Sequence, residues 1–150
     1  MKKLESGRSM VEMLGVLAII GVLSIGGIAG YTLSMRRHRA NKAVDALNKY
    51  ALLIYDDCQK QLARAEVSDM SACRGIGKMS EVGIDGGPDL IEDLIDMYDV
   101  EQKNNVDYVR IEVKVASHEI CRAIQSVMGS MASKDCLPEN NWLTVRIPQN

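Results

Sequence analysis

A single acidic residue, Glu12, stands at the start of a long stretch without charge. From Met13 to Tyr31 the chain has no charged side chain, and a helix of this length can cross the hydrocarbon core of a bilayer. A carboxylate in such a segment costs on the order of 3 kcal/mol, so it usually marks a functional site. Glu12 therefore either has a specific partner or is an edge charge that reaches the membrane interface.

The four cysteines are the other residues that could form strong bonds. They are Cys58, Cys73, Cys121 and Cys136. Zinc sites bring paired ligands within two to four residues and thiol redox motifs use C-x-x-C, and neither spacing occurs here. Three disulfide pairings are possible, and we expect 58 with 73 and 121 with 136, because each joins a helix to the loop after it. The alternative is buried thiols, which would imply a cytoplasmic domain.

Other patterns that could do chemistry are weak. Residues 75–79 resemble a phosphate-binding loop but lack its first glycine and its Ser or Thr. A calcium site using Asp85, Asp89 or Asp93 would lack the EF-hand spacing. No nucleophile, base and orienting group come together, so we predict no enzyme, no cofactor and no metal site.

A helix must position Glu12, and its glycines indicate how that helix packs. Gly26 and Gly30 form a G-x-x-x-G pair, which permits close approach between helix backbones. Each glycine costs about 1 kcal/mol relative to alanine in a helix. Alternatively, the pair has no packing role and reflects only the common use of glycine in membrane spans. We assign residues 8–35 to a transmembrane helix that packs against copies of itself or against lipid.

The helix is predicted to continue to about residue 66. No Pro or Gly interrupts residues 31–74, and apolar side chains recur at steps of three or four. They are Ala40, Val44, Leu47, Ala51, Ile54, Cys58, Leu62 and Ala65. This second half is amphipathic, and we expect a folded domain along its stripe, with Cys58 facing the core.

The remaining chain predicts an α+β module. Residues 107–115 alternate apolar and polar and predict a half-buried strand, and residues 142–147 predict a last strand paired with it. Ser117 is placed to cap a short helix over residues 118–128. Residues 88–97 predict a short amphipathic helix with Pro and acids in its first turn. The expected fold is a long helix packed on a small antiparallel sheet.

Composition and charge limit the function classes. Phe is absent and aromatics are 4%, so the domain of residues 36–150 needs disulfides to support a marginal core. A net charge of -2 does not point to nucleic acid, and none is expected as a partner. A basic collar consists of Arg36, Arg37, Arg39, Lys42 and Lys49. We expect it to meet the acidic residues 81–101 between stacked subunits, the alternative being lipid attraction for the collar and solubility for the acids.

The first 35 residues resemble the N-terminus of type IV pilins and type II secretion pseudopilins. The likeness lies in a basic leader of residues 1–7 ending at Gly7, in Glu12 five residues later, and in the apolar helix that follows. It implies that a prepilin peptidase cuts after Gly7 and that Glu12 neutralises the new amino terminus of a neighbouring subunit. The chain departs from the pattern at Arg8, where the family usually has an apolar residue whose amine is methylated.

The role implied for Glu12 has a physical basis. A free α-amine has a pKa of about 7.7 to 8.0 and is mostly charged at neutral pH. Burying it among apolar helices is costly unless an anion pairs with it. A carboxylate within a few residues of the cut supplies that anion, to its own chain or to an adjacent one.

The resemblance implies a structural subunit of a type IV pilus-like filament. Its partners would be copies of itself, other pilins, the prepilin peptidase, the inner-membrane assembly platform and membrane lipid. It would cross the bacterial inner membrane once with its domain outside the cytoplasm, then enter a cell-surface or periplasmic filament. The resemblance also implies that the loop between Cys121 and Cys136 corresponds in position to the disulfide-bounded C-terminal region of the family.

Several alternatives remain open. The chain could be a secretion pseudopilin, or a membrane-anchored binding protein that does not polymerise. A secretory signal peptide cut near Ile28-Ala29-Gly30 would compete for the N-terminus. More cations follow the apolar run than precede it, which by charge alone places the domain inside the cell. The cysteines and the leader favour the opposite orientation.

Overall fold

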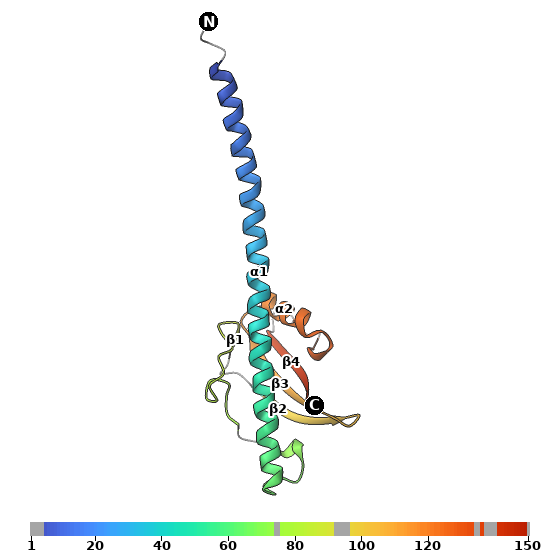
Figure 1. Ribbon diagram of the computed structural model, residues 1–150. Helices are drawn as coiled ribbons and strands as arrows, with labels where there is room; N and C mark the ends of the chain where they lie inside the picture. Colours follow the sequence, from blue (N-terminus) through green and yellow to red (C-terminus); the bar gives the residue numbers. More distant parts are fainter. Residues whose placement is uncertain (1–4, 74–75, 92–96, 134–135, 137–140, 150) are drawn as a thin grey trace. The chain divides into compact units, whose positions relative to one another are not determined.

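The computed structural model describes residues 5–73, 76–91, 97–133, 136 and 141–149. The chain divides into two compact units, Met1–Arg36 and Arg37–Asn150. The helix α1 (Glu5–Ala63) contributes to both units (Figure 1). It ends close to the predicted end, where Ala65 takes a left-handed φ of 56°, a conformation that commonly terminates helices.

The second unit contains an antiparallel sheet, which has four strands within the described residues. These are β1 (Leu90–Ile91), β2 (Met97–Lys103), β3 (Val106–Val115) and β4 (Trp142–Gln149). The strand β3 pairs with each of the other three, and Ile111 lies opposite both Tyr98 and Val145. The predicted strands at residues 107–115 and 142–147, and their pairing, are confirmed.

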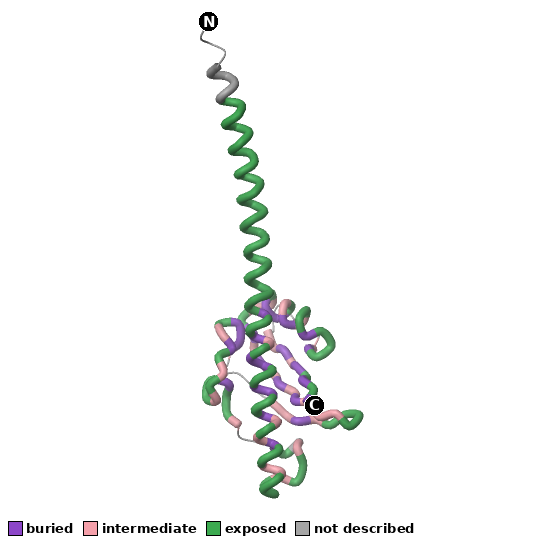
Figure 2. Tube along the Cα trace, in the orientation of Figure 1, coloured by how far each residue is buried: buried purple, intermediate pink, exposed green. Residues whose placement is uncertain are grey.

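The core lies between the second half of α1 and one face of the sheet (Figure 2). On the sheet, the alternation of β3 buries Val109, Ile111, Val113 and Val115 on this face. On α1 the buried side chains are Ala40, Ala43, Ala46, Leu47, Tyr50, Ala51, Ile54 and Cys58. Four of these are alanines, so the helix presents a narrow face to the sheet. The predicted α+β architecture is confirmed, and Cys58 faces the core as expected.

The helix α2 (His118–Met128) confirms the prediction for residues 118–128. The Oγ of Ser117 accepts a hydrogen bond from the backbone N–H of Ile120 at 3.3 Å and so caps the first turn. Its apolar side adds Ile120, Cys121, Ile124 and Met128 to the core. Within the described residues there are also two 3-10 turns, η1 (Met70–Ala72) and η3 (Gly129–Met131).

The prediction of a helix over residues 88–97 is wrong where the structure describes it. Leu90 and Ile91 pair with β3 instead, and Met97 begins β2, while residues 92–96 lie outside the described residues. The strands β2 and β3 are joined by a two-residue turn, Asn104–Asn105, whose φ angles are 53° and 60°. Asparagine tolerates this left-handed conformation, which matches the twist of a hairpin.

Two tyrosines hold the loop that follows η1. The Tyr50 hydroxyl donates to the carbonyl of Gly77 at 2.6 Å, and the Tyr98 hydroxyl accepts from the N–H of Ile76 at 3.0 Å. Their rings meet edge to face with centroids 6.4 Å apart. Burial, with a smaller contribution from Tyr98, raises the pKa of Tyr50 from 10.0 to about 12.

The stability of the domain should therefore fall at high pH. The unfolded chain loses the Tyr50 proton near pH 10 and the folded chain only near pH 12, so the folded state binds more protons between these values. We expect the free energy of unfolding to decrease from pH 10 to 12. The variant Tyr50→Phe should lack this part of the slope and should lose about 0.5–1.5 kcal/mol at neutral pH with its hydrogen bond. Denaturant unfolding of both proteins checks this, and equal slopes would contradict it.

Candidate functional site

Glu12 lies on α1 in the first unit, and its side chain is exposed in the single chain. The bond between Gly7 and Arg8 belongs to the same helix, although the side chains of residues 5–9 lie outside the description. Arg8 precedes Glu12 by four positions, which is about 6 Å along a helix axis, or roughly one turn. An amine at residue 8 and the carboxylate of Glu12 could therefore pair within a chain or between neighbouring chains.

The first unit exposes apolar side chains on all sides of the helix. Its large apolar residues from Met10 to Met35 have exposed fractions of 39% to 73%. They are Met10, Val11, Met13, Leu14, Val16, Leu17, Ile19, Ile20, Val22, Leu23, Ile25, Ile28, Tyr31, Leu33 and Met35. Figure 2 shows this part of the helix as exposed along its length.

Such a surface must be covered in the cell. Removing each large apolar side chain from water contributes roughly 1.5–3 kcal/mol, so exposure of the whole segment is strongly unfavourable. The helix is long and apolar enough to cross a membrane, by length and composition, a test that signal sequences near an N-terminus also pass. Lipid or the apolar helices of other subunits would cover this apolar surface equally well.

The two glycines of the G-x-x-x-G pair leave open space on the helix. A Cβ placed on either Gly26 or Gly30 would have no neighbour within 4 Å. The two positions stand four residues apart and so share one face of the helix. Among the described residues nothing outside the helix packs on these two positions, so the small size of the glycines is available to a neighbouring molecule.

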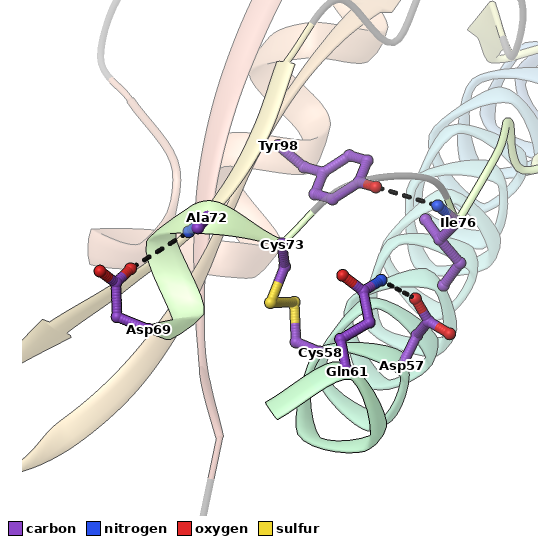
Figure 3. The surroundings of a disulfide bond; sticks show 8 residues. All are labelled: Asp57, Cys58, Gln61, Asp69, Ala72, Cys73, Ile76 and Tyr98. Atoms are coloured by element: carbon purple, nitrogen blue, oxygen red, sulfur yellow. Dashed lines mark hydrogen bonds between the residues drawn. A yellow bond between two sulfur atoms is a disulfide. The ribbon is translucent and has the colours of Figure 1, made fainter. Parts of the chain in front are cut away.

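Both expected disulfides are formed. Cys58 at the end of α1 bonds to Cys73 after η1, and Cys121 of α2 bonds to Cys136. Figure 3 shows the first bridge between the last turns of α1 and the η1 segment. All four cysteines are at most 9% exposed. Each bridge thus fixes a loop to a helix inside the core of the second unit.

The η1 segment has a further restraint beside this bridge. The carboxylate of Asp69 accepts a hydrogen bond from the N–H of Ala72 at 3.2 Å, which caps the turn. On α1, the side-chain amide of Gln61 donates to Asp57 at 2.6 Å. These contacts surround the bridge in Figure 3, and the bridge adds a covalent cross-link between the end of η1 and α1.

The basic collar contacts the acidic segment within one chain. Arg39 forms an ion pair with Asp89, whose side chain is 3% exposed, and its Nε donates to Asp89 Oδ2 at 3.1 Å. Lys42 Nζ lies 3.2 Å from Asp85 Oδ2, and both side chains are more than half exposed. Two collar cations therefore anchor the loop before β1 within the chain, instead of the contact between subunits that was expected for them. The contact between stacked subunits stays a prediction for the other collar residues.

These contacts also bear on the two acids considered for calcium. Asp85 accepts from the backbone N–H of Gly87 at 2.7 Å, and this bond, with Lys42, lowers the pKa of its carboxyl. Asp89 is engaged by Arg39, and Asp93 lies outside the described residues. Among the residues described, no group of three or more His, Cys, Asp or Glu side chains is placed to hold a metal ion.

Loss of the Arg39 charge should destabilise the domain. The variant Arg39→Gln leaves the buried carboxylate of Asp89 without its cation, and we expect a loss of about 1.5–3 kcal/mol in the free energy of unfolding. Lys42→Gln is the matched control, because its partner is exposed and screened by water. Equal effects of the two variants in denaturant unfolding would contradict a special role for Arg39.

A charge network on the sheet was not singled out from sequence. Arg110 of β3 donates through Nε and Nη2 to the two carboxylate oxygens of Asp99 on β2, at 3.1 and 2.6 Å. Glu101 lies 3.4 Å from Arg110 Nε and 3.5 Å from Arg146 Nε of β4. Asp99 raises the pKa of Arg110. The alternating charges of β3 signalled an outward face, but β2 itself was missed.

No family model matches the chain, and no curated protein or solved structure matches it either. The first unit brings together the predicted cleavage point, Glu12 and the glycine pair on one helix. The second unit holds both disulfides.

Proposed function

We propose that this chain is the structural subunit of a type IV pilus-like filament, inserted in the inner membrane and polymerised through its N-terminal helix. The observation that carries the proposal is the helix from Met10 to Met35, which exposes apolar side chains on every side. Lipid covers this surface before assembly, and the same segments of neighbouring subunits cover it afterwards. A type II secretion pseudopilin is the alternative with the same geometry.

Glu12 sets the register of this assembly. Removal of residues 1–7 leaves a charged amine at residue 8, and a filament core of packed helices excludes water from it. The carboxylate of Glu12 on an adjacent subunit neutralises that amine. Gly26 and Gly30 let the helix backbones approach closely. The resemblance of residues 1–35 to pilins and pseudopilins supports this assignment.

The disulfides and the leader support an extracytoplasmic location for the second unit. Disulfides persist in oxidising compartments such as the periplasm and the cell surface. The leader of residues 1–7 would remain on the cytoplasmic side, where a prepilin peptidase removes it. The domain then decorates the filament and presents its sheet and loops to the surroundings.

The mass of the mature protein tests this proposal. Intact-mass spectrometry of chain purified from cells with a prepilin peptidase should give an N-terminus at Arg8 and no free thiol. The variant Gly7→Leu places a large side chain at the cleavage point and should keep the full mass. Gly15→Leu makes the same change away from that point and should be processed normally. An N-terminus at Met1 or Tyr31 in the parent protein would contradict the proposal.

A further inference from the structure

A cleft of about 690 Å³ lies in the second unit at the β2–β3 turn. The hairpin forms one wall through Lys103 and Asn104, and η3 forms another through Ser130 and Met131. This volume falls within the range of ligand pockets. The Asn104–Asn105 turn closes the hairpin, and η3 lies within the loop that the Cys121–Cys136 bridge closes.

The floor of the cleft is an aromatic and apolar platform. Tyr108 of β3 lies directly opposite Pro148 of β4 and opposite Glu101 of β2. Because Val109 and Ile111 point into the core, Tyr108 stands on the other face of the sheet. Met131 lines the cleft as well and is 38% exposed. The apolar face of a ring can lie on this platform.

Cations and polar groups surround the platform. Arg146 has a 3.5 Å contact to Glu101, which also serves Arg110. Lys103 is exposed, and among the described residues its ammonium has no ion pair. The cleft thus offers two cations and one carboxylate that is already shared. An anionic group of a ligand could form ion pairs with both Lys103 and Arg146.

We propose that this cleft binds a carboxylated saccharide of the uronic acid class. The apolar face of a pyranose ring would lie on Tyr108, as amphipathic rings use aromatic surfaces. Its carboxylate would pair with Lys103 and Arg146, and its hydroxyls would hydrogen-bond with Asn104 and Ser130. The site lies wholly in the second unit, so the proposal does not rest on filament assembly.

The lining favours a saccharide over other anions. The carboxylate of Glu101 can accept hydrogen bonds from the hydroxyls of a sugar, which offset its repulsion of the single sugar carboxylate, whereas it would repel the successive phosphates of a nucleic acid. The whole chain is also acidic, with a net charge of -2. An acidic peptide would use the two cations but would leave the ring platform without a matching group.

Calorimetric titration of the full-length protein in detergent micelles tests the proposal. The probes are a galacturonic acid trimer, a neutral galactose trimer, a glutamate-rich peptide and a single-stranded oligonucleotide. We expect saturable binding of the galacturonic acid trimer, at least about tenfold tighter than that of the neutral trimer. Tighter binding of the peptide or the oligonucleotide would overturn the proposal, as would equal binding of the two trimers or no binding.

Four variants locate the binding. Tyr108→Ala and Lys103→Gln should each weaken binding of the acidic trimer about tenfold. Tyr108→Phe keeps the ring and should bind as the parent does, which separates loss of the platform from loss of the fold. Lys49→Gln removes the same charge from α1, outside the cleft, and should have no effect. Binding that Lys103→Gln leaves unchanged, or that Lys49→Gln weakens equally, would overturn the proposal.

Discussion

The variant Glu12→Ala is expected to abolish filament formation while leaving the protein in the membrane. Each added subunit would then bury a terminal amine without a counter-charge, and removing one partner of a buried pair costs about 3–5 kcal/mol. A loss of this size lowers the affinity of each addition by more than about a hundredfold. Electron microscopy of sheared filaments and immunoblots of the membrane fraction measure both results.

Two control variants separate the charge from other effects. Glu12→Gln keeps the size and polarity of the side chain but cannot neutralise an amine, so it should fail almost as completely. Glu66→Ala removes an exposed carboxylate from the second unit and should assemble normally. Filaments of Glu12→Ala at the parent level would show that this acid is only an edge charge at the membrane interface.

Removal of one disulfide should cost the domain much of its stability. In the chain-entropy model, a bridge closing about 15 residues contributes roughly 3 kcal/mol. The double variant Cys58→Ala with Cys73→Ala should therefore lower the free energy of unfolding by about this amount. Denaturant unfolding of the full chain in micelles provides the measurement.

The second bridge is a matched comparison. Cys121 and Cys136 have the same sequence separation of 15, so the double alanine variant should lose the same entropic term. Chemical reduction of the parent protein should remove both contributions together. A parent protein whose stability is unchanged by reduction would contradict the view that the bridges support a small core.

Local patterns were sufficient to predict much of the fold. The predicted apolar stripe on α1 is buried at Ala40, Leu47, Ala51, Ile54 and Cys58, because one face of a helix recurs every three to four residues. Its other members are less buried: Val44 and Leu62 are half-buried, and Ala65 is exposed beyond the end of the helix. Apolar and polar residues alternate along β3, and Ser117 caps α2, so each element can be predicted from a few consecutive residues. The pairing of the cysteines followed from the elements that contain them.

The missed elements lack a local signal that overrides competing patterns. Leu90 and Ile91 follow a proline and precede spaced apolar residues, a pattern that fits a short helix as well as a strand. The pairing of Leu90 with Val115 makes this segment a strand, and Val115 is distant from it in sequence. The Asn104–Asn105 pair is a hairpin signal, and it could have indicated that a strand, β2, precedes β3.

The candidate site was predictable in part for the same reason. Glu12 and the glycine pair can be recognised from sequence because the apolar residues around them are their neighbours in the chain. The contact of Arg39 with Asp89 spans 50 positions, and charge alone does not say whether such a pair forms within a chain or between chains. The cleft around Tyr108 depends on three strands and η3, so no local pattern could reveal it.

The proposed contact between Glu12 and a terminal amine can be tested directly in filaments assembled from this chain. Cells growing on ¹⁴N and ¹⁵N media supply two forms of the chain, which are mixed, assembled together and treated with a zero-length carbodiimide cross-linker. Mass spectrometry should find an amide between the amine of residue 8 in one isotopic form and the carboxylate of Glu12 in the other. Filaments that give no such hybrid peptide, while other surface carboxylates and lysines are cross-linked, would contradict the assembly mechanism.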